Sequence, residues 1–244
     1  MPAFFRRKPK SGSKQEPVID FTGTSGDDIV IGASAPRRDA ESYLDEGNVY
    51  FTVGQWTLAI DRYTAAIEIN PAMARAYYNR ASAHTQAGDT KRAIADYDRA
   101  IDLDPRDADS FNNRGMLHMK TGNHAAAVRD FDAALAIDPN DTTIIVNRAL
   151  ALMQSGHLEP ALAGFEHAIT LNPNDAAASF GAGQAAALLG RRNASLRHLS
   201  LALALNPAYA AEIAGEPNLA LLSGDPDFLK LLRDSQTRPH RPEA

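Results

Sequence analysis

The 244-residue chain contains no cysteine, and this absence excludes disulfide bonds, cysteine-ligated metal sites and thiol catalysis. Aromatic residues are scarce as well, at 7% of the chain. Together with many alanines and 16 glycines, this favours a helical protein packed through small residues over a β-sandwich or barrel. The 44% of hydrophobic residues still provides material for a sizeable core.

The sequence also lacks a long hydrophobic run. No stretch approaches the length of a bilayer span, and no apolar segment of signal-peptide length follows the basic residues 1–14. These residues leave open a transit peptide or a membrane-touching patch, although a solvated, disordered segment is the commoner case. We therefore expect a cytoplasmic protein without a membrane span. Little lysine beside abundant arginine and alanine hints at a bacterial source.

Positive charge is not concentrated along the chain. The net charge is -5, and residues 40–209 carry fourteen Lys and Arg against nineteen Asp and Glu. Nucleic-acid binding needs a basic stripe that displaces counterions from phosphates. We therefore expect no nucleic-acid partner.

A period of 34 residues runs through most of the chain. It is marked by proline at the end of each unit, at Pro71, Pro105, Pro139, Pro173 and Pro207. The corresponding units are 40–73, 74–107, 108–141, 142–175 and 176–209. A fixed period of this size indicates stacked supersecondary units.

Small and bulky residues recur at fixed positions within these units. Position 15 is always glycine, as in Gly88, and position 20 is alanine in four units, as in Ala93. An aromatic residue follows four positions later in the same four units, as in Tyr97, and alanine comes three further along. Spacings of four and three place these residues on one face of a second helix that follows the glycine turn.

With these residues the chain resembles the tetratricopeptide repeat family. The resemblance implies an all-α, right-handed α-solenoid of five helix-turn-helix repeats over residues 40–209. Two apolar segments follow in residues 210–234, and we expect them to form capping helices over the open end of the stack. Residues 1–39 should be disordered or weakly structured, and residues 235–244 should form a disordered tail.

We find no constellation for catalysis or for a cofactor. The histidines show no HExxH spacing, and phosphate-binding glycine loops and the GxSxG motif are absent. His84 and His118 take equivalent places in adjacent units, where the family carries an interface tyrosine, so packing is favoured over a metal site. The repeats leave no room for a catalytic domain, and we expect a non-enzymatic protein without metal or cofactor.

One segment resembles a different family. The nonapeptide GTSGDDIVI, residues 23–31, matches once the repeat of calcium-binding parallel β-rolls. The next nonapeptide has lost the pattern, and a single copy should leave a cation incompletely coordinated. A glycine-rich turn is the favoured interpretation.

The candidate binding residues follow from three Asn-Arg pairs, each in the first helix of a unit. The resemblance places positions 2, 5, 6, 9 and 13 of each first helix in the concave groove. An amide donates and accepts, so a row of amides could hold an extended peptide backbone. The predicted groove residues are Asn48, Tyr78, Asn79, Asn112, Asn113, Met116, Val146 and Asn147, with Met119 as a further apolar contact. The alternative is that these amides only hydrogen-bond the neighbouring helix, and the paired arginines are expected to be structural.

The family's groove for a partner's C-terminal carboxylate needs cations that this chain lacks. Asn48 and Asn79 match that pattern, but Leu44, Asp109 and Asn113 stand where lysine and arginine are required. A carboxylate would not recover its desolvation cost there. We therefore expect an adaptor or scaffold that binds an extended segment of a partner protein. A self-assembling scaffold, with one molecule's N-terminal segment or cap in its neighbour's groove, remains the alternative, and residues 17–31 could instead fill their own groove.

Overall fold

The computed structural model describes residues 39–236, and every regular element in this range is a helix. The chain divides between Arg106 and Asp107 into two compact units. We name residues 39–106 the N-terminal unit and residues 107–236 the C-terminal unit. The predictions for residues 1–38, including the nonapeptide 23–31 and the possible groove ligand 17–31, lie outside the described residues.

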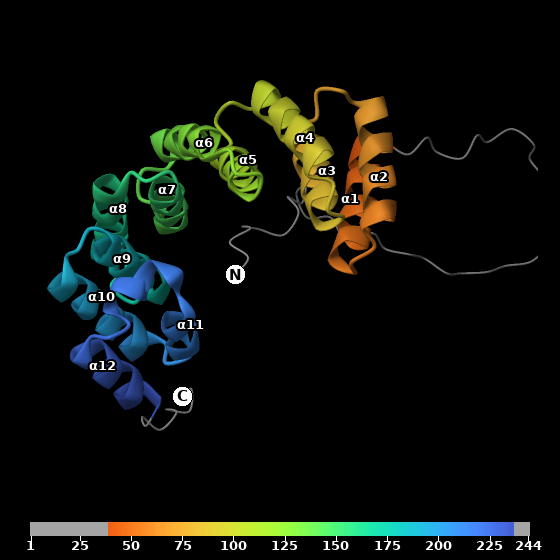
Figure 1. Ribbon diagram of the computed structural model, residues 1–244. Coiled ribbons are helices and arrows are strands. Elements are labelled where there is room, and N and C mark those ends of the chain that lie inside the picture. The colour runs from red at the N-terminus through yellow and green to blue at the C-terminus, as the bar shows by residue number, and fades with distance from the viewer. Residues whose placement is uncertain (1–38, 237–244) are drawn as a thin grey trace, which may run out of the picture. The chain divides into compact units, whose positions relative to one another are not determined.

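The N-terminal unit consists of two helical hairpins (Figure 1). In each hairpin the two helices pack against each other, and the second helix of the first hairpin also packs on the first helix of the next. The four helices are α1 (Ala40–Thr52), α2 (Trp56–Ile69), α3 (Ala74–Gln86) and α4 (Thr90–Leu103).

The C-terminal unit continues the same pattern with three hairpins. Its six hairpin helices are α5 (Ala108–Lys120), α6 (His124–Ile137), α7 (Thr142–Gln154), α8 (Leu158–Leu171), α9 (Ala176–Leu188) and α10 (Arg192–Leu205). Each helix packs on the next in chain order, and the first helices α5, α7 and α9 also contact one another in sequence. All five first helices begin at the first residue of a 34-residue unit.

The hairpin turns and helix starts have clear local causes. The five turn glycines have backbone φ angles between 71° and 83°, a conformation that costs glycine little and other residues more. Asp89 and Asn123 follow the turn glycine in two hairpins, and their side chains cap the next helix by accepting hydrogen bonds from the backbone N–H groups of Arg92 and Ala126. Asp107 differs from this pattern, because its carboxylate accepts from the Ser110 hydroxyl at 2.7 Å instead of capping the backbone.

The core is built from the small and aromatic positions of the period. In the third repeat Phe131 is 0% exposed and packs with Ala127, Ala134 and Ile144. Gly115 on α5 makes room for this ring, because a Cβ atom at Gly115 would lie 2.8 Å from the Phe131 Cε1 atom. The alternation of large and small residues therefore sets how closely the two helices of a hairpin approach.

The cap differs in detail from its prediction. It contains three elements where two helices were expected: α11 (Tyr209–Gly215), the 3-10 helix η1 (Pro217–Leu222) and α12 (Pro226–Gln236). The apolar segment before α12 forms the 3-10 helix and not an α-helix. Pro217, which lacks an N–H group, begins this turn. The helix α12 ends two residues beyond the predicted boundary at 234.

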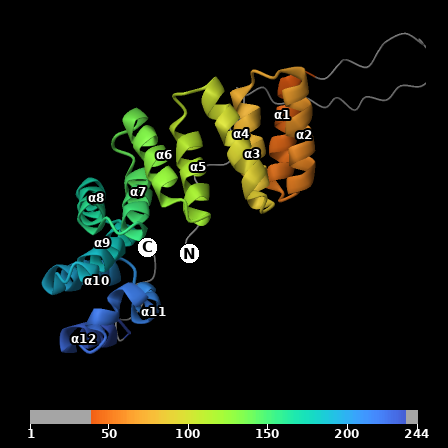
Figure 2. The ribbon, with the colours of Figure 1, turned by 45° about the horizontal axis from the view of Figure 1, so that its top comes forward.

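The capping role itself rests on buried apolar side chains. Leu219, Leu222 and Phe228 are at most 5% exposed and pack with Leu199 and Leu203 of α10. Leu229 on α12 is 41% exposed and does not belong to this cluster. In both views the blue helices α11 and α12 lie at the end of the C-terminal unit beyond α10 (Figures 1 and 2).

The cap also covers the first helix of the fifth repeat. The 3-10 helix η1 packs on α9, and the ring of Phe180 on α9 contacts the ring of Tyr209, with centroids 5.2 Å apart. Every residue from Ala178 to Ala187 is buried, because α9 packs on α8 and α10 as well as on η1.

An arginine clamp ties the cap to α10, and it predicts a pH dependence. Arg192 donates hydrogen bonds to Asp225 and Asp227, and the bond from Arg192 is the largest cause that lowers the pKa of Asp225 below 3.8. A lowered pKa in the folded state gives stabilisation that is present above the unfolded value and lost as pH falls through the folded value. We expect the amide protection of α12 in hydrogen exchange to decrease when the pH is lowered past about 4.

The neighbouring arginine supplies the control for this prediction. Arg192→Gln should lower the protection of α12 at neutral pH and remove most of its acid dependence. Arg191→Gln should leave both unchanged, because Arg191 contacts Glu159 only at 3.9 Å. An acid dependence as large in Arg192→Gln as in the wild type would contradict the assignment.

Candidate peptide-binding surface

The first helices of the N-terminal unit are joined by an amide network. Asn79 on α3 donates through Nδ2 to Asn48 Oδ1 on α1 at 2.8 Å. The same oxygen accepts the hydroxyl of Tyr63 on α2 at 3.0 Å. Asn79 is 0% exposed and Asn48 is half-buried. These two predicted groove residues therefore lie together and cross-link three helices.

A second amide network joins the first helices of the C-terminal unit. Asn147 on α7 donates through Nδ2 to Asn112 Oδ1 on α5 at 3.0 Å, and Asn112 donates to Asn113 Oδ1 at 3.4 Å. All three side chains are buried. The Oδ1 atom of Asn147 is buried without a hydrogen-bond partner, which is costly for a polar atom. The helix-to-helix bonds that the sequence left as an alternative are thus present, and one acceptor is left over.

The predicted apolar contacts occupy two different environments. Tyr78 is 1% exposed, and its ring packs edge-on against Tyr97 of α4 with centroids 5.7 Å apart. Val146 is 2% exposed within the core around α7. Met116 and Met119 are half-buried on α5, where they border the core around Phe131. The two methionines are therefore the partly accessible members of this group.

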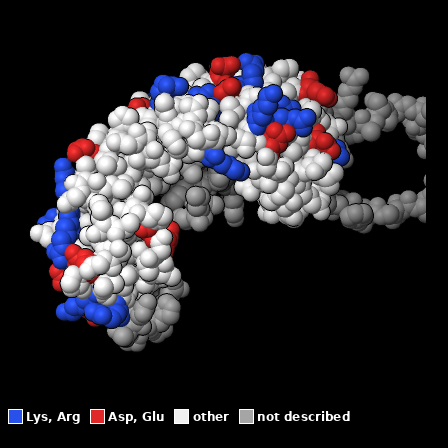
Figure 3. Space-filling model, viewed as in Figure 1, with Lys and Arg blue, Asp and Glu red and all other residues white. Residues whose placement is uncertain are grey.

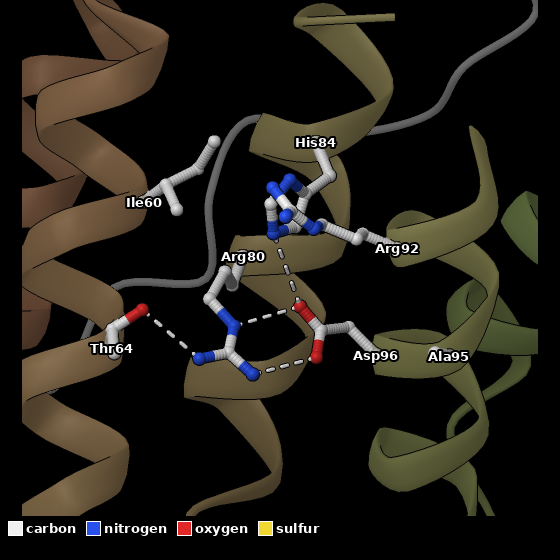
Figure 4. Close-up of a pocket in the computed structure, with 7 residues that line it drawn as sticks. All are labelled: Ile60, Thr64, Arg80, His84, Arg92, Ala95 and Asp96. Carbon is white, nitrogen blue, oxygen red and sulfur yellow. Dashed lines mark hydrogen bonds and ion pairs between the residues drawn. The ribbon is translucent and has the colours of Figure 1, made fainter. Parts of the chain in front are cut away.

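The arginines of the Asn-Arg pairs form ion pairs, as expected for a structural role. Arg80 donates to both carboxylate oxygens of Asp96 at 2.8 Å and to the Thr64 hydroxyl at 3.0 Å. Figure 4 shows its guanidinium between Thr64 on α2 and Asp96 on α4, so one side chain connects three helices. Arg114 makes the equivalent two-oxygen pair with Asp130 on α6.

The two histidines of interest lie beside these ion pairs. His84 Nε2 is 3.9 Å from Asp96 Oδ2, and His118 Nε2 is 3.8 Å from Asp130 Oδ2. Burial lowers the pKa of His84, against the opposing effect of the Asp96 carboxylate. Within residues 39–236 no group of three or more histidine or acidic residues is arranged to hold a metal ion.

Charges of both signs are interspersed on the surface. Figure 3 shows Lys and Arg beside Asp and Glu over α8, α10 and α12, and again over the N-terminal unit. The visible face of the described part carries no continuous basic stripe. None of the helices between residues 39 and 236 is long and apolar enough to cross a membrane.

Sequence reasoning missed the partners of the arginines. Asp96 and Asp130 both stand at position 23 of their units, 34 residues apart, and this spacing was the available signal. The charge pair is reversed in the first repeat, where Arg62 at position 23 lies 3.7 Å from Glu46 at position 7. In the first three repeats, positions 7 and 23 therefore form an ion pair between the two helices of the repeat.

Solved structures share this fold. The chain is 25% identical to YrrB, a tetratricopeptide repeat protein with an unusual peptide-binding site, with a TM-score of 0.63 over 69% of this chain and 87% of that one. MamA from Desulfovibrio magneticus RS-1 is 18% identical, with a TM-score of 0.66 over 69% of this chain and 96% of that one. Another MamA structure is 19% identical, with a TM-score of 0.64 over 68% of this chain and 96% of that one.

Sequence comparison gives the family. No curated protein matches the chain. Three family profiles, each described as a tetratricopeptide repeat, match residues 44–108, 80–144 and 142–175, which together span more than half of the sequence. The five-hairpin architecture and the solved relatives agree with these matches, and they indicate a protein-interaction scaffold. The chain belongs to the tetratricopeptide repeat family.

Proposed function

We propose that the protein is a non-enzymatic adaptor whose first helices bind an extended segment of a partner protein. The binding surface comprises the half-buried methionines of α5 and the amides of α5 and α7, with Asn48 and Asn79 forming the corresponding surface of the N-terminal unit. The observation that carries the proposal is the unpaired Oδ1 atom of Asn147. A peptide N–H group is the donor that would satisfy it.

The repeat period explains why this acceptor is left over. Asn48 and Met116 stand at position 9 of the first and third repeats, and Asn79 and Asn147 at position 6 of the second and fourth. In the N-terminal unit these two positions are in hydrogen-bond contact at 2.8 Å. In that contact Asn79 donates and Asn48 accepts. By the same register we expect Met116 to lie beside Asn147, where its thioether offers no strong donor to the Asn147 Oδ1 atom.

Methionine suits the proposed role in a second way. Its unbranched side chain has three rotatable bonds and can change its packing around a ligand. Asn147 is covered in the structure, so a peptide reaches it only when neighbouring side chains move. A methionine beside the amide lowers the cost of this movement, and it fits a surface that accepts a backbone with varied side chains.

Self-association is the alternative occupant of the same surface. The cap is a poor candidate for docking into a second copy, because Leu219, Leu222 and Phe228 are already buried in its own packing. A partner protein of different sequence is therefore the preferred ligand. Light-scattering mass at several concentrations separates the two, because a strict monomer is expected for the adaptor.

Site-specific photocrosslinking tests the proposed surface. A photoreactive residue at Met116 should yield adducts that map to one short segment of a partner, whereas the same residue at Ala125 or Ala136, exposed on α6, should not. A synthetic peptide of that segment should bind the purified protein. Asn147→Leu, which removes the acceptor, should weaken this binding about fivefold or more, since one hydrogen bond to a buried group is worth about 1–3 kcal/mol.

Two results would contradict the proposal. One is equal crosslinking from Met116 and from the exposed α6 positions. The other is a peptide whose affinity is unchanged by Asn147→Leu in a variant that keeps the wild-type circular dichroism spectrum.

A further inference from the structure

The fourth repeat lacks the carboxylate that two other repeats use to hold their arginine. Gly164 stands at position 23, where the second and third repeats have Asp96 and Asp130. A pocket of about 410 Å³ opens beside Gly164 and Arg148. We name it the Arg148 pocket, and its wall comprises Leu135, Pro139, Ile145, Arg148, Pro160, Ala163, Gly164 and His167.

The other two repeats show how a carboxylate sits at this position. Asp96 accepts from the Nε and Nη2 atoms of Arg80, both at 2.8 Å, as Figure 4 shows. Asp130 accepts from the same two atoms of Arg114, at 3.0 and 2.6 Å. This two-oxygen geometry is the strong form of an arginine-carboxylate pair.

Arg148 is held less completely than these two arginines. It turns to Asp132 on α6, to which its Nε atom donates. Arg148 and Asp132 are 35% and 51% exposed, whereas Arg80 and Arg114 are each 19% exposed. Among the described residues the Arg148 Nη1 and Nη2 atoms make no hydrogen bond. Arg148 therefore keeps donors for a second carboxylate.

We propose that the Arg148 pocket binds an acidic side chain of a partner protein, flanked in the partner by an apolar residue. The carboxylate takes the place beside Arg148 that Asp96 and Asp130 take in their repeats. The flanking residue contacts the apolar wall formed by Leu135, Ile145 and Pro160. The pocket is lined by α6, α7 and α8, and on α7 its wall includes Ile145 and Arg148 but not Asn147. The proposal therefore does not depend on the function proposed for the amide surface.

The composition of the wall favours a protein side chain over a small inorganic anion. Five of its eight residues are apolar side chains of leucine, isoleucine, proline or alanine. These apolar side chains form no hydrogen bonds with a hydrated ion. They can bury the methylene groups of a glutamate and the apolar residue next to it in the partner. His167 supplies an imidazole that can donate to the second side of a carboxylate.

Two peptides and one variant of the protein, Gly164→Asp, test this site. The probes are acetyl-Leu-Glu-Leu-amide and its matched control acetyl-Leu-Gln-Leu-amide, titrated into the full chain while the Arg148 Nε–Hε resonance is followed by NMR. We expect the glutamate peptide to shift this resonance and to bind at least about tenfold more tightly than the glutamine peptide. Gly164→Asp should abolish the shift, because the introduced carboxylate occupies the place of the ligand.

The variants separate charge from shape. A Cβ atom at Gly164 would lie 3.1 Å from the Ala149 Cβ atom, but the second repeat accommodates Ala81 and Asp96 at the same two positions. Gly164→Ala should therefore keep binding. Arg148→Gln, followed through backbone amide resonances because it lacks the arginine Nε–Hε group, should lose binding even if Gly164→Asp folds poorly. Equal binding of the two peptides, no shift with either peptide, or undiminished binding by folded Gly164→Asp would overturn the proposal.

Discussion

Replacing Phe131 with alanine is expected to lower the free energy of unfolding of the C-terminal unit by about 3–5 kcal/mol. The ring is fully buried between α5, α6 and α7, among Ala127, Ala134 and Ile144. Its neighbours are already small, so they cannot collapse into the cavity that the truncation leaves. Urea unfolding followed by circular dichroism at 222 nm measures the loss.

An exposed leucine in the same unit gives the control. Leu229→Ala, on the outward face of α12, should change the free energy of unfolding by no more than about 0.5 kcal/mol. A loss below about 1 kcal/mol for Phe131→Ala would mean that the hairpin can close around the missing ring. That result would contradict the packing described for position 24.

Asp130→Ala is expected to cost about 3 kcal/mol, although it removes only one surface-proximal carboxylate. Asp130 has a side chain 8% exposed and holds two nitrogens of Arg114. Removing the carboxylate leaves a largely buried guanidinium without this counter-charge, which is costlier than losing an exposed pair. Urea unfolding again supplies the measurement.

The matched control lies two residues away on the same helix. Asp132→Ala also removes a carboxylate from an arginine, but the Asp132 side chain is 51% exposed and should cost less than about 1 kcal/mol. Equal losses for the two variants would show that burial does not distinguish the pairs. The double change Arg114→Met with Asp130→Leu should recover much of the loss, because it removes both charges together.

The repeat architecture was predictable because it depends on local and periodic information. Glycine at position 15 marks the turn in every unit, and alanine at position 20 marks the helix crossing in four of the five. The caps Asp89 and Asn123 act within a few residues of themselves, so the chain order alone identifies them. The cap was predicted from its apolar residues. Which of these residues would be buried and which exposed, such as Leu229, was not predicted.

The partners of the polar side chains were harder to foresee. Asn79 donates to Asn48, 31 residues earlier, and Asn147 donates to Asn112, 35 residues earlier. These two separations differ from each other and from the 34-residue period, so the period does not predict the pairing. The sequence could say that these amides share a helix face, and it left open whether they bind a ligand or each other. The packing of η1 on α9 could not be predicted either, because the period ends before Pro217 and nothing in that segment indicates its direction.

The interaction of peptide backbone with the amides of α5 and α7 is the central claim, and a single series of peptides tests it. The partner segment captured at Met116 would be synthesised with one backbone nitrogen methylated at a time, and its affinity for the wild-type protein measured by calorimetry. Methylation removes one N–H donor and leaves the side chains unchanged. We predict at least one position at which affinity falls about tenfold or more. Full affinity across the whole series, with losses only when peptide side chains are changed, would contradict backbone capture.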